Sequence, residues 1–242
     1  AALAGWNEEQ TQTGLAHIYI ARKNFQKLLD EIIIINTWSA DTLANISALR
    51  ALAYAGLDNT AHATTTLDEG RIYSENALQV LITTAKFQLS GILDGDALVT
   101  LKKALSSYPN NTELLLLHAA YNTQNNKLKQ AASNYRKIIK LDPPGLLTAN
   151  GRQAHIGLAQ LQIIEKNYEE ANTVLTQLLN RNDNDPEANY LGGLLALNQK
   201  DYHLAEDHVR KLLAIAPDHS KSQQLMGEIK YALNDFDQAA HH

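Results

Sequence analysis

The sequence predicts an all-α protein in which about seven helix-turn-helix repeats stack into an α-solenoid. The first observation is that two amphipathic stretches meet at a short polar turn within Pro186–His219. In the second stretch, apolar residues follow the three-and-four spacing of one helix face. The second observation is that small residues recur at intervals of about 34 residues, with one longer step. A unit of this size cannot bury its apolar face alone, so the copies are expected to stack.

Two separate positions mark the same repeat. The expected first helix of each copy carries a small residue, at Ala16, Ala51, Ala85, Ala119, Ala159, Gly193 and Gly227. The expected second helix carries its own marker, at Leu28, Ala63, Ala97, Ala131, Ala171, Ala205 and Ala239. Successive copies are separated by the same six steps at both positions, including the longer step after the fourth copy. This agreement indicates a repeat rather than coincidence.

A step of about 34 residues is the length of a tetratricopeptide repeat. The chain resembles the tetratricopeptide-repeat (TPR) family over almost its whole length, on Gly193, Ala205 and Pro217 and their equivalents. An aromatic residue also follows the turn in four copies, at Phe25, Tyr168, Tyr202 and Phe236. The resemblance implies a right-handed superhelix whose first helices line a concave groove and whose second helices form the outer wall. The chain departs from the family pattern at Glu75 and Asp183, where Pro is expected.

Taken in order, the chain begins with a short lead-in, residues 1–8, where Trp6 either covers the first repeat or is loose. The TPR array (9–242) is expected to comprise repeats 9–43, 44–77, 78–111, 112–145, 152–185, 186–219 and a truncated 220–242, with a six-residue insertion at 146–151. We expect Trp38 to pack between repeats, and the apolar run Ile32–Ile35 to lie on the second helix of the first repeat. Two glycines in the stretch Ser90–Gly95 predict a turn.

The insertion falls between Pro143 and Ala159, which lie further apart along the chain than the equivalent pair Pro217 and Gly227. We predict that it adds a helical turn or lengthens the first helix of the fifth repeat. The apolar pair Leu146 and Leu147 is expected to pack there. The fourth and fifth repeats should therefore remain stacked.

The seventh repeat stops early in its second helix, and a terminal repeat has no neighbour to cover its outer face. That exposed face is expected to include Leu225, Ile229 and Leu233. Either a longer helix or a second chain would cover it.

Composition argues against several classes of function. The net charge is −5 and no basic stripe is present, so nucleic-acid binding has little electrostatic support. The absence of Cys excludes disulfides and thiolate metal sites. No apolar run approaches the ~18–20 residues of a transmembrane helix. The sequence begins without Met and resembles an excised or processed fragment, whose final His241 and His242 are native or part of a tag.

No pattern of catalytic residues is present, so a non-enzymatic protein without cofactor or metal is expected. His203 and His208 lie five residues apart, on different faces of a helix, and are interpreted as exposed polar residues. The stretch Asn182–Asp185 lacks the pattern of a calcium loop. We interpret it as an inter-repeat turn that ends in an N-cap.

Function is therefore expected on the surface of the array. The groove positions implied by the resemblance are mostly apolar, and include Ile82, Lys86, Leu89, Leu116, Ile156, Gln160, Ile163, Tyr190, Leu194, Leu197, Glu228 and Tyr231. No repeat carries the Lys and Asn pair with which some TPR proteins hold a terminal carboxylate. An apolar groove suits an amphipathic helix or an extended apolar peptide, with Tyr190 as an anchor. The alternative is that these residues pack against adjacent helices and meet no partner.

These observations predict a protein-protein interaction scaffold. Residues 213–219 and 225–239 also resemble bacterial envelope TPR lipoproteins of exopolysaccharide and exosortase (PEP-CTERM) systems. That resemblance implies a periplasmic or outer-membrane location and assembly partners. A regulatory TPR part of a larger enzyme is one alternative. The other is a structural module that forms a homo-oligomer through its groove or its truncated C-terminal end.

Overall fold

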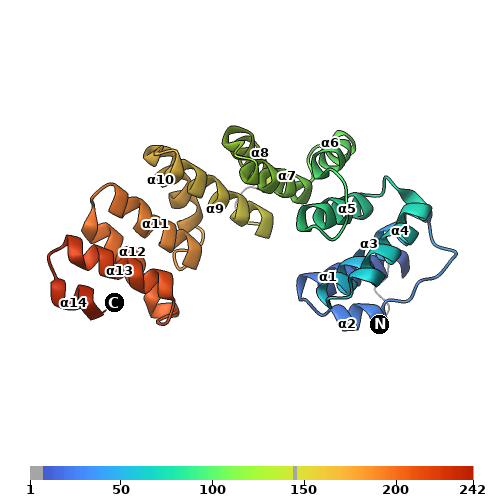
Figure 1. The fold of residues 1–242 in the computed structure, drawn as a ribbon, viewed down its shortest axis with the longest axis horizontal. Coiled ribbons are helices and arrows are strands. Elements are labelled where there is room, and N and C mark those ends of the chain that lie inside the picture. The colour runs from blue at the N-terminus through green and yellow to red at the C-terminus, as the bar shows by residue number, and fades with distance from the viewer. Residues whose placement is uncertain (1–7, 144–145, 242) are drawn as a thin grey trace. The chain divides into compact units, whose positions relative to one another are not determined.

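A computed structural model describes residues 8–143 and 146–241, so Trp6 and His242 lie outside the described residues. Within the described ranges the chain forms fourteen α-helices and no strand (Figure 1). The helices are α1 (Glu8–Ala21), α2 (Phe25–Glu31), α3 (Ala40–Gly56), α4 (Thr60–Ser74), α5 (Leu78–Ser90), α6 (Ala97–Ser107), α7 (Thr112–Gln124), α8 (Leu128–Leu141), α9 (Ala149–Ile164), α10 (Tyr168–Leu179), α11 (Pro186–Asn198), α12 (Tyr202–Ile215), α13 (Ser220–Ala232) and α14 (Phe236–His241). The predicted all-α architecture of helix pairs is confirmed.

The chain divides into two compact units, called here unit 1, up to Tyr121, and unit 2, from Asn122 onward. The boundary falls inside α7, which opens the fourth repeat. In both units, odd-numbered helices pack against each other as well as against their own second helices: α3 contacts α1 and α5 in unit 1, and α11 contacts α9 and α13 in unit 2.

Polar side chains cap the N-termini of several helices by accepting a hydrogen bond from a backbone N–H of the first turn. These N-caps are Ser39, Asn59, Asp96, Thr148, Asp185 and Asp201. The N-cap at Asp185 confirms the interpretation of Asn182–Asp185 as a turn that leads into a helix.

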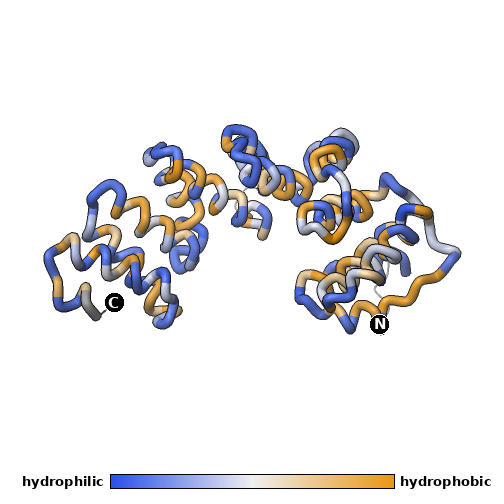
Figure 2. The backbone as a smooth tube through the Cα atoms, viewed as in Figure 1, coloured by the Kyte–Doolittle hydropathy of each residue, from blue (hydrophilic) through white to orange (hydrophobic). Residues whose placement is uncertain are grey.

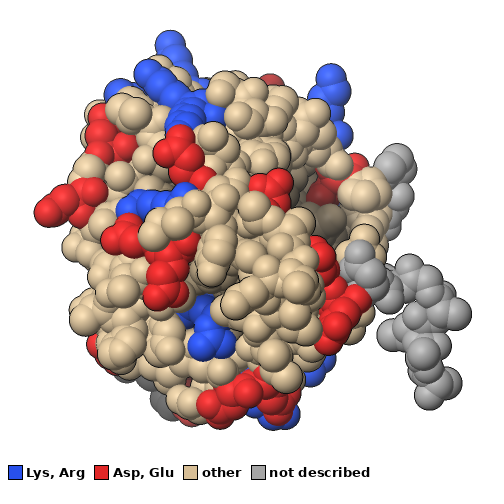
Figure 3. Space-filling model, turned by 90° about the vertical axis from the view of Figure 1, so that its right-hand side faces the viewer, with Lys and Arg blue, Asp and Glu red and all other residues tan. Residues whose placement is uncertain are grey.

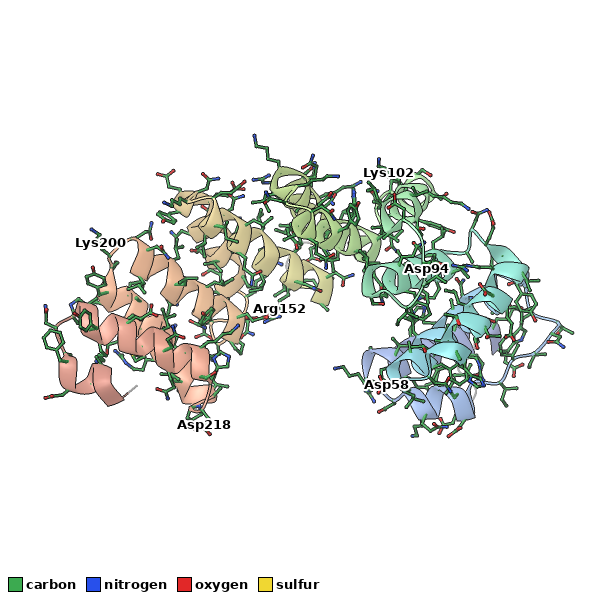
Figure 4. The ribbon with its side chains drawn as sticks, viewed as in Figure 1. Asp58, Asp94, Lys102, Arg152, Lys200 and Asp218 are labelled. Atoms are coloured by element: carbon green, nitrogen blue, oxygen red, sulfur yellow. The ribbon has the colours of Figure 1, made fainter. Side chains whose placement is uncertain are left out.

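The chain changes direction between the two helices of each pair, and residues with positive φ make this turn possible. In six pairs the residue with positive φ is not glycine, and its φ lies between 56° and 64°, at Lys23, Asp58, Asn126, Lys166, Lys200 and Asn234. Each directly precedes the residue that leads into the second helix. Asp58 and Lys200 are labelled in Figure 4. The third pair instead has Gly91 at φ 75° and Gly95 at φ 127°, in agreement with the turn predicted there.

Unit 1 has a core of Leu, Ile and Ala side chains in which Leu28 and Ile46 are fully buried. Trp38 is buried in the same core, as expected of a packing residue. The helix α3 begins at Ala40, so the boundary expected between residues 43 and 44 was placed four residues too late. The N-cap Ser39 explains the earlier start, because its side chain accepts a hydrogen bond from the backbone N–H of Thr42.

The predicted helical position of Ile32–Ile35 is wrong. Helix α2 ends at Glu31, and its C-cap Ile32 already has extended dihedral angles, φ −81° and ψ 104°. Four consecutive β-branched residues disfavour a helix, because their side chains crowd the preceding turn. The run instead forms the hydrophobic connection between α2 and α3 (Figure 2).

In unit 2 the insertion lengthens a helix, as predicted: α9 has 16 residues whereas α11 has 13. Helices α8 and α9 pack together and share one core, so the stacking between the fourth and fifth repeats is preserved there. Leu147 packs against this core, but Leu146 is exposed, which corrects the expectation that both would pack.

The expected exposed face of the last repeat is also wrong. Leu225 and Ile229 are buried, and Leu233 packs against the same core cluster, which includes Ala205 and Val209 of α12. These residues therefore face the preceding repeat rather than the end of the array. Among the described residues of this repeat, the large apolar side chains that are exposed are Tyr231 and Phe236, whose ring centroids are 5.4 Å apart.

Candidate interaction surfaces

Three of the predicted groove residues are not accessible. Ile82 is buried in the core that joins α5, α6 and α7, and Ile156 and Ile163 are buried in the core of unit 2. The reason is that α5 packs against α3 and α9 packs against α11, so part of the face assigned to the groove forms these contacts. The groove is consequently less apolar than predicted.

The other predicted positions remain at least partly accessible. Lys86, Leu89, Leu116, Tyr190, Leu194 and Leu197 are half-buried, whereas Gln160, Glu228 and Tyr231 are exposed. Two of them, Gln160 and Tyr190, line one pocket in unit 2. We name it the Tyr190 pocket.

The Tyr190 pocket has a volume of about 290 Å³. Its lining residues come from α9, α11, α12 and α13 and from the turn before α13, and are Gln160, Pro186, Glu187, Tyr190, Leu191, Leu212, Ala216, His219 and Lys221. The ring of Tyr190 meets the ring of His219 edge to face, at a centroid distance of 6.4 Å. His219 is oriented in turn by a contact of 2.6 Å between its Nδ1 and the Ser222 Oγ. The pocket is mixed, with an apolar wall of Leu191, Leu212 and Ala216 and a polar rim.

An ion pair next to this pocket fixes the start of α11. Arg152, labelled in Figure 4, belongs to the first turn of α9, and its Nε lies 2.5 Å from Oδ2 of Asp185. Its Nη2 donates to Asp185 Oδ1 at 2.9 Å, and its Nη1 lies 2.9 Å from Glu187 Oε2. The Asp185 side chain is 1% exposed and that of Arg152 is 35% exposed. Burial alone would raise the pKa of Asp185, but hydrogen bonds from Arg152 and the Ala188 backbone outweigh it and lower the pKa.

Unit 1 contains a polar cleft of about 430 Å³ on its first two odd-numbered helices, which was not predicted from the sequence. Its lining residues belong to α1 and α3 and are Glu9, Gln10, Thr13, Gly14, His17, Thr42 and Asn45. Glu9 Oε2 accepts hydrogen bonds from the hydroxyls of Ser39 and Thr42, at 3.1 and 2.8 Å. The three-and-four spacing of Gln10, Thr13 and His17 along α1 is the signal that could have predicted this polar face.

Charged residues of α5 and α7 act on this cleft. Lys86 Nζ lies 2.6 Å from Glu113 Oε1, so one predicted groove residue is held by an ion pair. The pKa of His17 is lowered, chiefly by desolvation, while Glu113 raises it and Lys86 lowers it further. Side chains of α1, α5 and α7 are therefore close enough to influence one another electrostatically.

His208 is not the exposed residue that we expected. It is half-buried against α11, where its Nδ1 lies 3.0 Å from Asn189 Oδ1 and its ring occupies the space above Gly192. Desolvation by burial lowers its pKa. His203 is exposed, as interpreted. The described ranges contain no group of three or more His, Asp or Glu that could hold a metal ion.

The surface charge is mixed on the face drawn in Figure 3, where Lys and Arg side chains alternate with Asp and Glu. Among the helices of the described ranges, none combines the length and the apolar character that crossing a bilayer requires.

No protein-family model matches the chain, and no curated protein matches its sequence. Solved structures do. PilW, described as a widely conserved type IV pilus biogenesis factor, is 15% identical, with a TM-score of 0.71 over 82% of this chain and 89% of its own. A TPR protein from Parabacteroides merdae is 15% identical, with a TM-score of 0.66 over 82% of this chain and 77% of its own.

YrrB, described as a TPR protein with an unusual peptide-binding site, is 17% identical, with a TM-score of 0.58 over 82% of this chain and 95% of its own. At these identities the similarity concerns the fold alone. The chain has the α-solenoid fold of tetratricopeptide-repeat proteins.

Proposed function

We propose that the chain is a non-enzymatic scaffold that binds a peptide or helix of a partner protein along the accessible surface of its first helices. The observation that carries this proposal is the Tyr190 pocket, a preformed concavity with an apolar wall and a few polar groups at its rim. Such a site is typical of places that receive one anchoring side chain of a ligand. The peptide-binding site of YrrB, a protein of the same fold, is a supporting analogy.

The pocket suits an apolar side chain of moderate size. Leu191, Leu212 and Ala216 would contact it, and the ring of Tyr190 would cover it. The Tyr190 hydroxyl and the Gln160 amide can exchange hydrogen bonds with the peptide backbone that carries this side chain. The ligand would therefore present one or two apolar anchors in a polar sequence, rather than the continuous apolar face that the predicted groove residues suggest.

The ordered start of α11 favours peptide binding at the Tyr190 pocket. Arg152 and Asp185 hold the first turn of α11, which supplies Glu187 and Tyr190 to the pocket. A site that is ordered before binding loses less conformational entropy when the ligand arrives. The ion pair thus supports binding without touching the peptide.

The experiment is selection from a phage-displayed library of random dodecapeptides, followed by calorimetric titration of one selected synthetic peptide. Tyr190→Ser should weaken its binding about 30-fold, the effect of losing an anchor of about 2 kcal/mol. The matched control is Tyr73→Ser, which removes an exposed Tyr from the second helix α4. Equal binding by wild type and Tyr190→Ser, or loss of binding in the control alone, would contradict the proposal.

We further propose that the partner belongs to a bacterial envelope export or exopolysaccharide assembly. The support is the sequence resemblance within residues 213–239, and the fold shared with PilW is compatible with it. Fractionation of the source cells tests this assignment, with the protein expected in the periplasm or at the outer membrane. Recovery in the cytosol alone would contradict it and leave the peptide-binding proposal intact.

A further inference from the structure

Five first helices bury an apolar side chain in a core that they share with the preceding repeat. These side chains occupy equivalent positions in the repeat, and are Ala53, Phe87, Leu161, Leu195 and Ile229. Ile229, for example, lies in one core cluster with Ala205 of the sixth repeat. The residue of α1 at this position is Ile18, which is 48% exposed. Helix α1 therefore presents to solvent the face with which other first helices contact a preceding repeat.

The seventh repeat presents the complementary face. A pocket of about 540 Å³ lies between α13 and α14, and its lining residues are Gly227, Glu228, Tyr231, Phe236 and Ala239. Ala239 is the equivalent of Ala205, so it stands where Ile229 would find its neighbour in a following repeat. The rings of Phe236 and Tyr231 are exposed at the same place. The pocket is thus the receiving half of an inter-repeat contact.

A contact inside unit 1 indicates how a first helix covers an aromatic residue at the position of Phe236. Phe25 is the equivalent residue of the first repeat, and its ring occupies the space above Gly56, the last residue of α3. The equivalent of Gly56 in α1 is Ala21. Ala232 holds the same place in α13, so an alanine is accommodated between stacked repeats.

The charges beside these two faces are opposite. Arg22 and Lys23 directly follow Ala21, and both are exposed and without an ion pair among the described residues. Asp235 and Asp237 flank Phe236. If Ala21 covers Phe236, the two cations come close to the two carboxylates, and such complementarity favours one orientation of the contact.

We propose that α1 of a second copy of this chain docks on the pocket between α13 and α14, with Ile18 in the pocket and Ala21 over the ring of Phe236. A second copy is the occupant because one chain carries both halves of the inter-repeat contact, with charges that match. The two halves are different surfaces, so a copy whose α1 is bound still offers its own pocket to another. This contact does not involve the Tyr190 pocket.

Sedimentation equilibrium of the whole chain tests the proposal, and the average mass is expected to rise with concentration. Ile18→Asp removes the apolar side chain of α1, and Phe236→Asp removes the exposed ring but suits the first turn of α14. Each should weaken self-association about tenfold or more, as the loss of an anchoring side chain does. The matched control is Ile72→Asp, which replaces a side chain 84% exposed on α4 and should leave the association unchanged.

A mixture of the two variants tests whether different surfaces meet. The Ile18→Asp variant keeps an intact pocket, and the Phe236→Asp variant keeps an intact α1, so one contact can form between them. The mixture should therefore contain one-to-one dimers at concentrations at which each variant alone is monomeric. A contact between two like surfaces would not be restored in this way.

Far-UV circular dichroism must match wild type for all variants; if Ile18→Asp or Phe236→Asp fails to fold, Arg22→Glu or Asp237→Lys takes its place. A chain that is monomeric up to about 1 mM overturns the proposal. So does association that survives the change in α1 or in α14, because it would form through another surface. A mixture that associates no more strongly than the separate variants overturns it as well.

Discussion

Replacing Asp185 with Ala removes two interactions at the start of α11. The first is the N-cap, in which Asp185 Oδ1 accepts from the Ala188 N–H at 3.0 Å, and a lost cap costs about 1 kcal/mol. The second is the pair of charged hydrogen bonds to Arg152. Hydrogen bonds to charged groups contribute about 1.5–3 kcal/mol, and the lower part of that range applies because Arg152 is 35% exposed and keeps Glu187. The expected loss in the free energy of unfolding is about 2–3 kcal/mol.

Two further variants separate these contributions. Asp185→Asn keeps a side-chain oxygen that can cap the helix but removes the charge, so it should lose only about 1–2 kcal/mol. Glu170→Ala breaks the ion pair with Arg136 in the same unit, where the side chains are 39% and 50% exposed. That change should cost less than about 1 kcal/mol, because solvent screens exposed ion pairs.

The assay is urea unfolding monitored by far-UV circular dichroism and by Trp fluorescence. Both tryptophans, Trp6 and Trp38, precede the boundary at Tyr121, so fluorescence reports on unit 1 and circular dichroism on all helices. Substitutions at Asp185 should shift the part of the circular-dichroism transition that belongs to unit 2.

The contribution of Asp185 to the free energy of unfolding should decrease in acid. The pKa of Asp185 is lower in the folded protein, so its stabilising effect is present above the unfolded pKa of about 3.9 and is lost as pH falls through the folded pKa. The difference in the free energy of unfolding between wild type and Asp185→Asn should thus be constant from about pH 5 to 8. It should shrink toward zero as the pH falls below about 4. A loss of less than about 0.5 kcal/mol for Asp185→Ala, which is the effect of an ordinary surface substitution, would refute the reasoning. A stability difference that widens in acid would refute it as well.

Three other outcomes are expected. Gly193→Ala should lower thermal stability, because its Cβ would lie 2.7 Å from Cγ2 of the fully buried Val209; overpacking of about 1–3 kcal/mol exceeds the gain of about 1 kcal/mol in helix propensity. Leu101→Ala should cost about 2–5 kcal/mol and, unlike the changes at Asp185, shift the Trp fluorescence transition of unit 1 in urea. Lys86→Met should raise the pKa of His17 in an NMR titration, since Lys86 lowers it; a fall would contradict the electrostatics of the polar cleft.

The repeat could be predicted from the sequence because helix packing leaves a strict period. Ala63, Ala131, Ala171 and Ala205, four of the second-helix markers, are all fully buried. Small residues at these positions permit close approach of two helices, so their spacing carries the register of the array. Helix ends were harder to predict, because capping by Ser39 decides where α3 begins.

The interaction surface could be predicted only in part. A helical wheel places Ile82 and Ile156 on the side that faces other first helices, but it does not distinguish open groove from helix contact. Tyr190 and Gln160 line a pocket because α12 and the turn that follows it supply the rest of the lining. That arrangement depends on tertiary packing. The same limit applies to the contact of Glu9 with Thr42, which joins residues 33 positions apart.

The six left-handed turn residues make it possible to compare the stability of individual repeats along the chain. A lysine in this conformation costs roughly 1–2 kcal/mol, whereas Asn and Asp adopt it more readily, so the array carries a comparable local cost at Lys23, Lys166 and Lys200. Lys166→Gly and Lys200→Gly relieve that cost in adjacent repeats, and each also makes the unfolded chain more flexible by the same amount. The two substitutions therefore make the same local change in two different repeats. Any difference between their effects on unfolding measures how strongly each repeat is coupled to its neighbours, the quantity that decides whether a linear array melts as a whole or from one end.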